Sequence, residues 1–298
     1  MNYRELTALL RTRYDEGEAL AIARLVMEDC FGLSLTDLAL GKDSHLSDKE
    51  RAELENIAQK LASGIPVQHV LGHATFCGRV FEVSPAVLIP RPETEELVRW
   101  VLDDVTAEAV TSAPKKWTMA DLGTGSGCIA VSISLGIKET LHAQGIQTET
   151  WAIDVSPEAL AIARKNADRL GADVIFRQLD MLDIATTSTS SILPELNCIV
   201  SNPPYVRQSE SVGMASHVLD HEPHLALFVP DTDPLRFYRA IARIGLQRLA
   251  DGGHVYVELN RDLAHETATL FADFGYDAIT LKRDMFGNER MLKARLKR

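Results

Sequence analysis

The sequence MADLGTGSGCIAV, residues 119–131, predicts a strand, a glycine-rich turn and a helix in direct succession. A turn of this kind is typical of α/β folds that bind nucleotide-like ligands, because glycines let a ligand approach the backbone where the helix begins. The spacing is Gly-x-Gly-x-Gly, which is common in α/β proteins and needs support from other elements. The residues expected to form the turn are Gly123, Thr124, Gly125, Ser126 and Gly127.

Two further predicted strands end next to acidic residues. Residues 151–154 end at Asp154, and residues 174–178 are followed by Asp180 and Met181. An acid at the end of the second strand can accept hydrogen bonds from both hydroxyls of a ribose. Asp180 and Met181 suit the amino group and the ring face of an adenine. Because parallel strands end at one edge of a sheet, these strand ends together predict a nucleoside site.

A fourth predicted strand, the apolar run 198–200, leads into Asn-Pro-Pro-Tyr. Pro203 and Pro204 have no backbone N–H to donate, so the chain leaves the sheet as a stiff segment that presents carbonyl oxygens. Asn202 adds a side-chain carbonyl and Tyr205 an aromatic face. The segment predicts a clamp for a planar group bearing an NH2, such as an amide or an amino-base, although a plain Pro-Pro turn explains this tetrapeptide equally well.

Residues 121–127 and 202–205 together resemble class I S-adenosylmethionine-dependent methyltransferases that act on planar NH2 nitrogens. The chain is more closely similar to the HemK/PrmC family, the glutamine methyltransferases of peptide-chain release factors. It departs from that family in lacking a glycine after Glu258 and in a Ser/Thr-rich insertion at residues 186–191. The motifs that carry the closer resemblance are Leu88–Glu95, His221–Leu227 and Arg283–Arg290.

The resemblance implies methyl transfer from S-adenosyl-L-methionine to the side-chain amide nitrogen of a glutamine, that of a Gly-Gly-Gln motif in a class-1 release factor. The product would be S-adenosyl-L-homocysteine, and no metal is expected. Only the resemblance suggests that Arg91 and Glu93 bind the substrate; by position they are helix-start residues. We expect Asn202, Pro203, Pro204 and Tyr205 to be catalytic and substrate-binding, and Gly123, Thr124, Gly125, Ser126, Gly127, Asp154, Asp180, Met181 and Asn202 to bind the cofactor.

The expected chemistry follows from the acceptor clamp. An amide nitrogen is a poor nucleophile because its lone pair is delocalised into the carbonyl. If the Asn202 side-chain oxygen and the Pro203 backbone oxygen accept its two N–H bonds, the nitrogen is oriented and its developing positive charge is stabilised. Tyr205 would hold the amide plane. A general base such as Glu222 is optional, because an alkylated amide nitrogen is strongly acidic.

Composition bounds the remaining possibilities. The chain has 298 residues, 46% hydrophobic, with a net charge of −11 and a pI of about 5.3. This charge gives no general attraction to nucleic acid phosphates, so a protein or small-molecule partner is favoured and direct nucleic acid binding is not expected. Its four cysteines form no Cys-x-x-Cys pair, and no signal peptide or membrane span is predicted. We expect a cytoplasmic monomer.

The pattern along the chain predicts two domains and a linker. Residues 1–74 are expected to form a small helical bundle for substrate recognition, with simple packing as an equal alternative. Residues 75–91 are expected to be a hairpin linker. Residues 92–298 alternate strands and helices, which predicts a Rossmann-like, doubly wound, mostly parallel sheet. Within this part, the loop 206–233 is long enough to predict a flexible cover for the active site.

Other functions remain open at this point. Methylation of an amino group on a DNA or RNA base would use the same clamp, but such an enzyme would need a basic surface and would have to extract its base from the stack. A ribosomal-protein glutamine methyltransferase would use the same site residues. A non-catalytic scaffold that binds S-adenosylmethionine is disfavoured because Asn202 and Tyr205 are intact. His217, His221 and His224 imitate a metal cluster, but no cysteine or suitably spaced acid supports them.

Overall fold

A computed structural model describes residues 1–111, 115–186, 192–214 and 216–297. The chain forms two compact units, each described below by itself. The N-terminal unit consists of Met1–His73 together with Met214–His221, and the sheet unit consists of Ala74–Gly213 together with Glu222–Arg298. Apart from Thr186, the predicted Ser/Thr-rich insertion lies outside the described residues.

The N-terminal unit is helical, as the sequence predicts. Three of its helices begin at capping boxes, formed by Asn2 with Glu5, Ser34 with Asp37, and Ser47 with Glu50. Each box satisfies backbone N–H groups that a helix start would otherwise leave without partners. The helices are α1 (Tyr3–Leu10), α2 (Glu16–Phe31), α3 (Leu35–Ala39), the 3-10 turn η1 (Lys42–His45), α4 (Asp48–Ala62) and α5 (Val67–Leu71), and α10 (Ser216–His221) groups with them.

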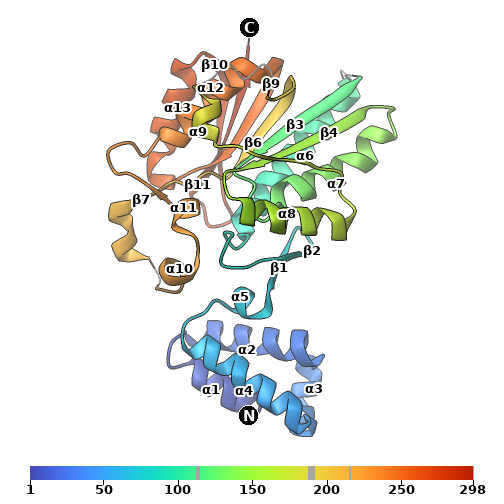
Figure 1. The fold of residues 1–298 in the computed structure, drawn as a ribbon, viewed down its shortest axis with the longest axis vertical. Coiled ribbons are helices and arrows are strands. Elements are labelled where there is room, and N and C mark those ends of the chain that lie inside the picture. Colours follow the sequence, from blue (N-terminus) through green and yellow to red (C-terminus); the bar gives the residue numbers. More distant parts are fainter. Residues whose placement is uncertain (112–114, 187–191, 215, 298) are drawn as a thin grey trace. The chain divides into compact units, whose positions relative to one another are not determined.

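A seven-stranded sheet organises the other unit, with strand order β10-β11-β9-β6-β3-β4-β5 (Figure 1). The strands from β9 to β5 are parallel, and β11 runs antiparallel to both β9 and β10. The order reverses between β3 and β6, the position at which open parallel sheets bind ligands. The strands are β3 (Lys116–Leu122), β4 (Gln147–Asp154), β5 (Ile175–Gln178), β6 (Leu196–Ser201), β9 (Leu249–Glu258), β10 (Tyr276–Arg283) and β11 (Glu289–Leu296).

Helices cover both faces of this sheet because its central strands are apolar on both sides. In β6, Cys198 and Val200 join the core under α6 and α7, while Ile199 joins the core under α12 and α13. This alternation is the period of two expected of a strand buried on both faces. The flanking helices are α6 (Pro92–Thr111), α7 (Cys128–His142), α8 (Pro157–Leu170), α9 (Met181–Ile184), α12 (Arg236–Arg248) and α13 (Ala264–Asp273), with the 3-10 turn η4 (Arg261–Leu263) before the last.

The predicted hairpin precedes the sheet. It consists of β1 (His73–Phe76) and β2 (Arg79–Glu82), joined through Cys77 and Gly78, both of which have positive φ. Two consecutive residues of this kind make the tight turn that matches the twist of two antiparallel strands. The segment after β2 packs Val87 and Ile89 against Ala159 of α8, so residues 74–91 belong to the sheet unit.

The predicted flexible cover contains regular structure instead. Between residues 206 and 233 lie β7 (Val206–Arg207), the 3-10 turn η3 (Gln208–Gly213), α10, α11 (His224–Leu227) and β8 (Phe228–Val229). Strands β7 and β8 pair in parallel, and the ring of His217 lies 6.5 Å from that of Tyr14. The described residues of this segment therefore contain short helices and strands where its length suggested a loop. Among the described residues, no helix is long and apolar enough to cross a membrane.

Candidate active site

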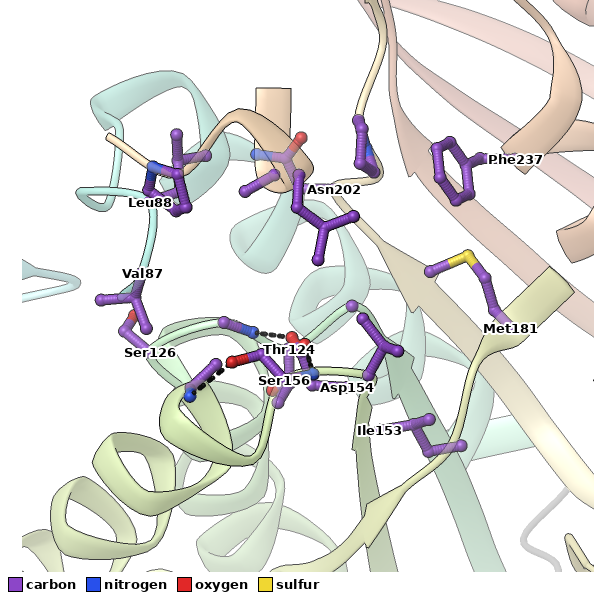
Figure 2. A pocket seen from close by; sticks show the side chains of 18 of the residues that line it. Val87, Leu88, Thr124, Ser126, Ile153, Asp154, Ser156, Met181, Asn202 and Phe237 are labelled. Carbon is purple, nitrogen blue, oxygen red and sulfur yellow. Dashed lines mark hydrogen bonds between the residues drawn. The ribbon is translucent and has the colours of Figure 1, made fainter. Parts of the chain in front are cut away.

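A cavity of about 640 Å³ lies at the carboxyl ends of the parallel strands. This volume is within the range of small-molecule sites. The ends of all four predicted strands line the cavity, together with residues before α6, from α11 and from α12. Figure 2 shows Val87 and Leu88 on the side opposite Phe237. Of the predicted site residues, the cavity is lined by Gly123, Thr124, Gly125, Ser126, Asp154, Asp180, Met181, Asn202, Pro204 and Arg91; Gly127, Pro203, Tyr205 and Glu93 lie outside its lining.

In the glycine turn, one glycine allows a helix to pack closely and another leaves its backbone open to a ligand. Gly123, Gly125 and Gly127 all have positive φ. A Cβ on Gly127 would lie 3.0 Å from the Cβ of Ala163 and 3.2 Å from its Cα, whereas a Cβ on Gly125 would have nothing within 4 Å. The first contact explains how α8 packs against the turn. The second leaves the Gly125 backbone accessible from the cavity.

Asp154 holds the turn from the neighbouring strand. One carboxylate oxygen accepts the N–H of Gly125 at 2.8 Å, and the other accepts the N–H of Ser156 at 2.9 Å. Burial raises the pKa of Asp154, while these N–H donors act in the opposite direction. A carboxylate has about four acceptor positions, so Asp154 can still accept hydroxyl hydrogens from a ligand. Its first structural role is to join the two loops.

Asp180 and Met181 form another part of the cavity wall. Asp180 caps α9 by accepting the Leu182 N–H at 2.8 Å, which fixes its carboxylate at the strand end. The Met181 side chain is buried and its Cε lies 3.2 Å from a Cβ position on Gly123. The cavity therefore combines a fixed carboxylate with a polarizable apolar surface, as a purine ring requires.

Asn202 lies across the cavity from Thr124 and Asp154 (Figure 2). Its Nδ2 donates to the hydroxyl of Thr94 at 3.2 Å. The hydroxyl of Tyr205 donates to Glu258 at 2.9 Å, and Arg290 lies 6.0 Å from the centre of its ring. Burial and the neighbouring Glu258 raise the pKa of Tyr205 well above its usual value. Glu258 and Arg290 therefore fix the position of Tyr205, and the expected role of its ring stays a prediction.

Beside the cavity, the partly exposed Arg91 pairs with the buried Glu222. The guanidinium of Arg91 donates to one oxygen of Glu222, and the other oxygen accepts the Ile89 N–H at 3.0 Å. The Glu222 side chain is 1% exposed. Both oxygens are thus occupied in joining the segment before α6 to the segment after α10. This pairing argues against the optional role of Glu222 as a general base.

Comparison with known proteins decides the family. A model of the PrmC N-terminal domain matches residues 3–72, and one of the methyltransferase small domain matches residues 101–225. A release factor glutamine methyltransferase of Bacteroides thetaiotaomicron is 41% identical over 96% of this chain and 95% of its own length. One from Flavobacterium psychrophilum is 38% identical over 98% and 97%. The chain belongs to the release factor glutamine methyltransferase family.

The fold is likewise that of known methyltransferases. The structure of an rRNA N2 methyltransferase of T. thermophilus (RsmC) covers 76% of this chain and 50% of that protein, with a TM-score of 0.50 and 18% identity. The predicted mostly parallel α/β fold and the resemblance to HemK/PrmC are both confirmed.

In this member of the release factor glutamine methyltransferase family, several residues that were not predicted as site residues support the site from outside the cavity lining. Asp121 is fully buried under the glycine turn, where one oxygen accepts from the Thr124 hydroxyl at 2.6 Å and from the Ala130 N–H at 3.2 Å. Within the described part of the chain its other oxygen has no partner. Burial raises the pKa of Asp121 to about 7.

Asn166 of α8 joins the hairpin to the glycine turn. Its side-chain oxygen accepts the Glu82 N–H at 2.7 Å, and its NH2 donates to the Glu82 and Ser126 carbonyls at 3.0 and 2.9 Å. An asparagine within a predicted helix does not indicate a structural role in the sequence, because such side chains are ordinarily solvated. Only the burial of this side chain, 0% exposed, makes its contacts consequential.

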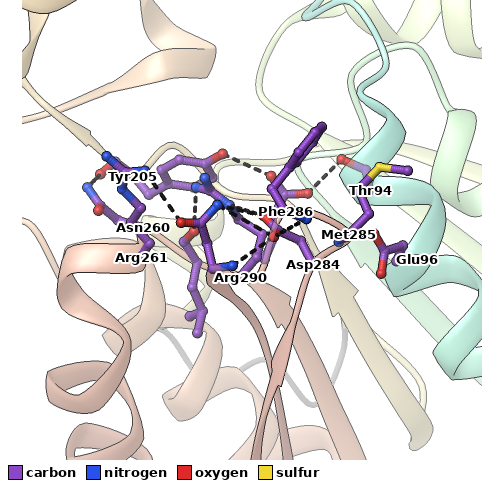
Figure 3. Close-up of polar contacts among 12 residues, drawn as sticks. Thr94, Glu96, Tyr205, Asn260, Arg261, Asp284, Met285, Phe286 and Arg290 are labelled. Carbon is purple, nitrogen blue, oxygen red and sulfur yellow. Dashed lines mark hydrogen bonds and ion pairs between the residues drawn. The ribbon is translucent and has the colours of Figure 1, made fainter.

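The family motif Arg283–Arg290 forms the tip of the β10–β11 hairpin (Figure 3). Asp284 accepts the N–H groups of Phe286 and Asn288, each at 2.9 Å, and its carboxylate lies 3.5 Å from the Nε of Arg290. Asp284 thus orders the turn and fixes Arg290 against Tyr205. The motif acts on the clamp through this contact.

Proposed function

We propose that this protein transfers a methyl group from S-adenosyl-L-methionine to the side-chain amide nitrogen of a glutamine in a peptide-chain release factor. The observation that carries this proposal is that Asn202 and Pro204 line the same cavity as the glycine turn and Asp154. A cofactor cradle and an acceptor for a planar NH2 therefore share one enclosed space. The names of the relatives supply the protein substrate.

The side chains present fit this cofactor. Backbone N–H groups at the start of α7 and the acceptors Asp154 and Asp180 suit the polar groups of a nucleoside and an amino acid. Met181 and Phe237 supply apolar surface for a purine. When bound, S-adenosylmethionine supplies an electrophilic methyl group on a sulfonium.

The residues of the clamp orient the target nitrogen and stabilise its charge. We infer that the Asn202 Oδ1 and the Pro203 carbonyl accept the two N–H bonds of the glutamine amide, which directs the nitrogen lone pair toward the methyl group. As the new N–C bond forms, positive charge develops on nitrogen, and preorganised acceptors stabilise it. The charged nitrogen is acidic and loses its proton without a strong base.

Residues 1–74 are proposed to recognise the protein target. Support comes from the match of the PrmC N-terminal domain model to residues 3–72 and from the confinement of the cavity lining to the sheet unit. Hydrogen exchange of the full chain tests this. Adding a release factor should slow exchange in α1 to α5, whereas cofactor alone should not; unchanged exchange in these helices would assign them a structural role.

Mass spectrometry tests the reaction itself. A purified, unmethylated release factor incubated with the protein and cofactor should gain one methyl group on a single glutamine, located by peptide fragmentation. Asn202→Ala protein serves as the matched control for contaminating activities. Absence of the methyl group, or its appearance on another residue type, contradicts the proposal.

A further inference from the structure

Thr94 connects the clamp to a buried carboxylate. The side chain comes from the first turn of α6, is 2% exposed and lies at the cavity wall beside Asn202. Its hydroxyl donates to Glu258 Oε2 at 2.6 Å and accepts from Asn202 Nδ2 at 3.2 Å. Glu258 ends β9, so this chain of hydrogen bonds joins segments 164 residues apart in sequence.

The number of available protons fixes the direction of these bonds. A threonine hydroxyl has one proton to donate, and an ionised carboxylate can only accept. The proton of Thr94 is therefore directed to Glu258, and only lone pairs of the hydroxyl oxygen remain for Asn202. The side chain of Asn202 can bond to Thr94 through its NH2 but not through its oxygen. The Asn202 Oδ1 is thus left for another donor.

Burial raises the pKa of Glu258 overall, but three neighbouring groups act in favour of its charged, accepting form. Tyr205 donates to its second oxygen at 2.9 Å. Burial raises the pKa of Glu258, as does the charge of Glu93, while Thr94, Tyr205 and the cation of Arg290 act against that rise. Tyr238 donates to the Glu258 backbone carbonyl at 3.1 Å and fixes the strand end. The carboxylate is held from several elements and cannot turn away from Thr94.

We propose that Thr94, held by Glu258, is a positioning residue that fixes the amide of Asn202 with its oxygen toward the substrate. The inference rests on the proposed function, in which the target is itself an NH2 group. An Asn202 side chain rotated by half a turn would present its own NH2 to that of the target, placing donor against donor. The Thr94–Glu258 pair excludes this orientation, so the clamp is set before the substrate arrives.

Substitutions of Thr94 test the role of the hydroxyl. Thr94→Val keeps the shape but cannot accept from Asn202, and Thr94→Ser keeps the hydroxyl. We expect Thr94→Val to lower the single-turnover rate at saturating cofactor by about 10- to 100-fold, the usual consequence of a misplaced reacting group. The Kd for cofactor should stay within about twofold, and Thr94→Ser should recover most of the rate. Thr94→Ala should match Thr94→Val if the hydroxyl matters more than packing.

A double-mutant cycle with Asn202→Ala separates positioning from a general structural effect. If Thr94 acts through Asn202, Thr94→Val should have little further effect on the residual rate of the Asn202→Ala protein. An equal loss in both backgrounds overturns the inference. So does a Thr94→Val rate within about threefold of the unmodified protein.

A readout independent of turnover separates this inference from the proposed function. In nuclear magnetic resonance spectra, the Asn202 side-chain NH2 signals, assigned by their loss in Asn202→Ala, should exchange slowly and shift in Thr94→Val but not in Thr94→Ser. Unchanged signals in Thr94→Val contradict the positioning role even if methyl transfer is observed. If no release factor is methylated, the proposed function fails while these signals still decide how Asn202 is held.

Discussion

Replacing Gly125 or Gly127 with alanine should produce two different defects, although the residues are neighbours in one turn. Both have positive φ, +54° and +80°, so alanine at either position costs about 1 kcal/mol or more in backbone conformation. At Gly127 the new methyl also meets Ala163 Cβ at 3.0 Å and Cα at 3.2 Å. Overpacking of this kind adds about 1–3 kcal/mol. Gly127→Ala should therefore lower the free energy of unfolding by roughly 2–4 kcal/mol.

At Gly125 the methyl meets no protein atom within 4 Å, but Gly125 lines the cavity. Its loss of stability should stay near 1 kcal/mol, while the methyl occupies space that a ligand needs to approach the backbone. We expect Gly125→Ala to weaken cofactor binding at least tenfold. Its N–H donation to Asp154 does not depend on the side chain, so that contact does not account for the loss.

Gly171 provides the matched control. It ends α8 with a φ of +72°, has nothing within 4 Å of a Cβ position, and is absent from the cavity lining. Gly171→Ala should show the conformational cost alone. Urea unfolding measures stability, and calorimetry with S-adenosylmethionine measures affinity. The reasoning is refuted if Gly125→Ala binds cofactor like the unmodified protein, or if Gly127→Ala is no less stable than Gly171→Ala.

Substitutions at three further residues probe the rest of the site. Asn202→Ala should lower the single-turnover rate by about 100- to 1,000-fold with little change in the Kd for cofactor. Asn202→Asp should recover little of this rate, because a carboxylate cannot donate to Thr94. An Asn202→Ala rate near that of the unmodified protein would refute the clamp. Asp154→Ala should weaken cofactor binding in calorimetry with the fold retained by circular dichroism; unchanged affinity would remove Asp154 from the site. Asp121→Asn should abolish the pH dependence of stability that Asp121 contributes. The pKa of Asp121 in the folded state, about 7, exceeds its ordinary value of 3.8. The folded state therefore holds a proton that the unfolded state has lost, and the free energy of unfolding falls as pH rises from 4 to 7. The fall is on the order of 1.4 kcal/mol per unit of pKa difference. Urea unfolding at several pH values measures the free energy of unfolding, and an equal fall with pH in both proteins would contradict this prediction.

The local sequence could predict those parts of the site that directly follow a single predicted strand. The glycine turn, Asp154, Asp180 and the Asn-Pro-Pro-Tyr segment each follow a strand pattern, and the parallel sheet brings them to one edge. No distant residue is needed for this step. The fold then follows from the alternation of strands and helices.

The supporting contacts could not be predicted because they depend on pairing between distant segments. Thr94 resembles any helix-start residue, and Glu258 resembles any strand-end acid, until β9 and α6 pack side by side. The local sequence predicts a role for the Tyr205 ring, but it does not predict that the buried Glu258 accepts the Tyr205 hydroxyl. A buried polar group binds the partner that its packing supplies, and packing is a property of the whole sheet unit.

Three carboxylates lie in the cavity wall or directly behind it: Asp154 lines the cavity, Asp121 bonds to Thr124, and Glu258 bonds to Thr94. Burial raises the pKa of Asp121, of Asp154 and of Glu258, and N–H or O–H donors partly offset that rise in each case. Such donors stabilise the charged form of a carboxylate but leave its negative charge in place, whereas a directly bound cation would neutralise that charge. Methyl transfer from a sulfonium to an amide moves positive charge across the cavity, and fixed carboxylates stabilise positive charge throughout that movement. Asp154 lines the cavity and is the acid placed to act on this charge, whereas Asp121 and Glu258 act on the site through their hydrogen bonds with Thr124 and Thr94.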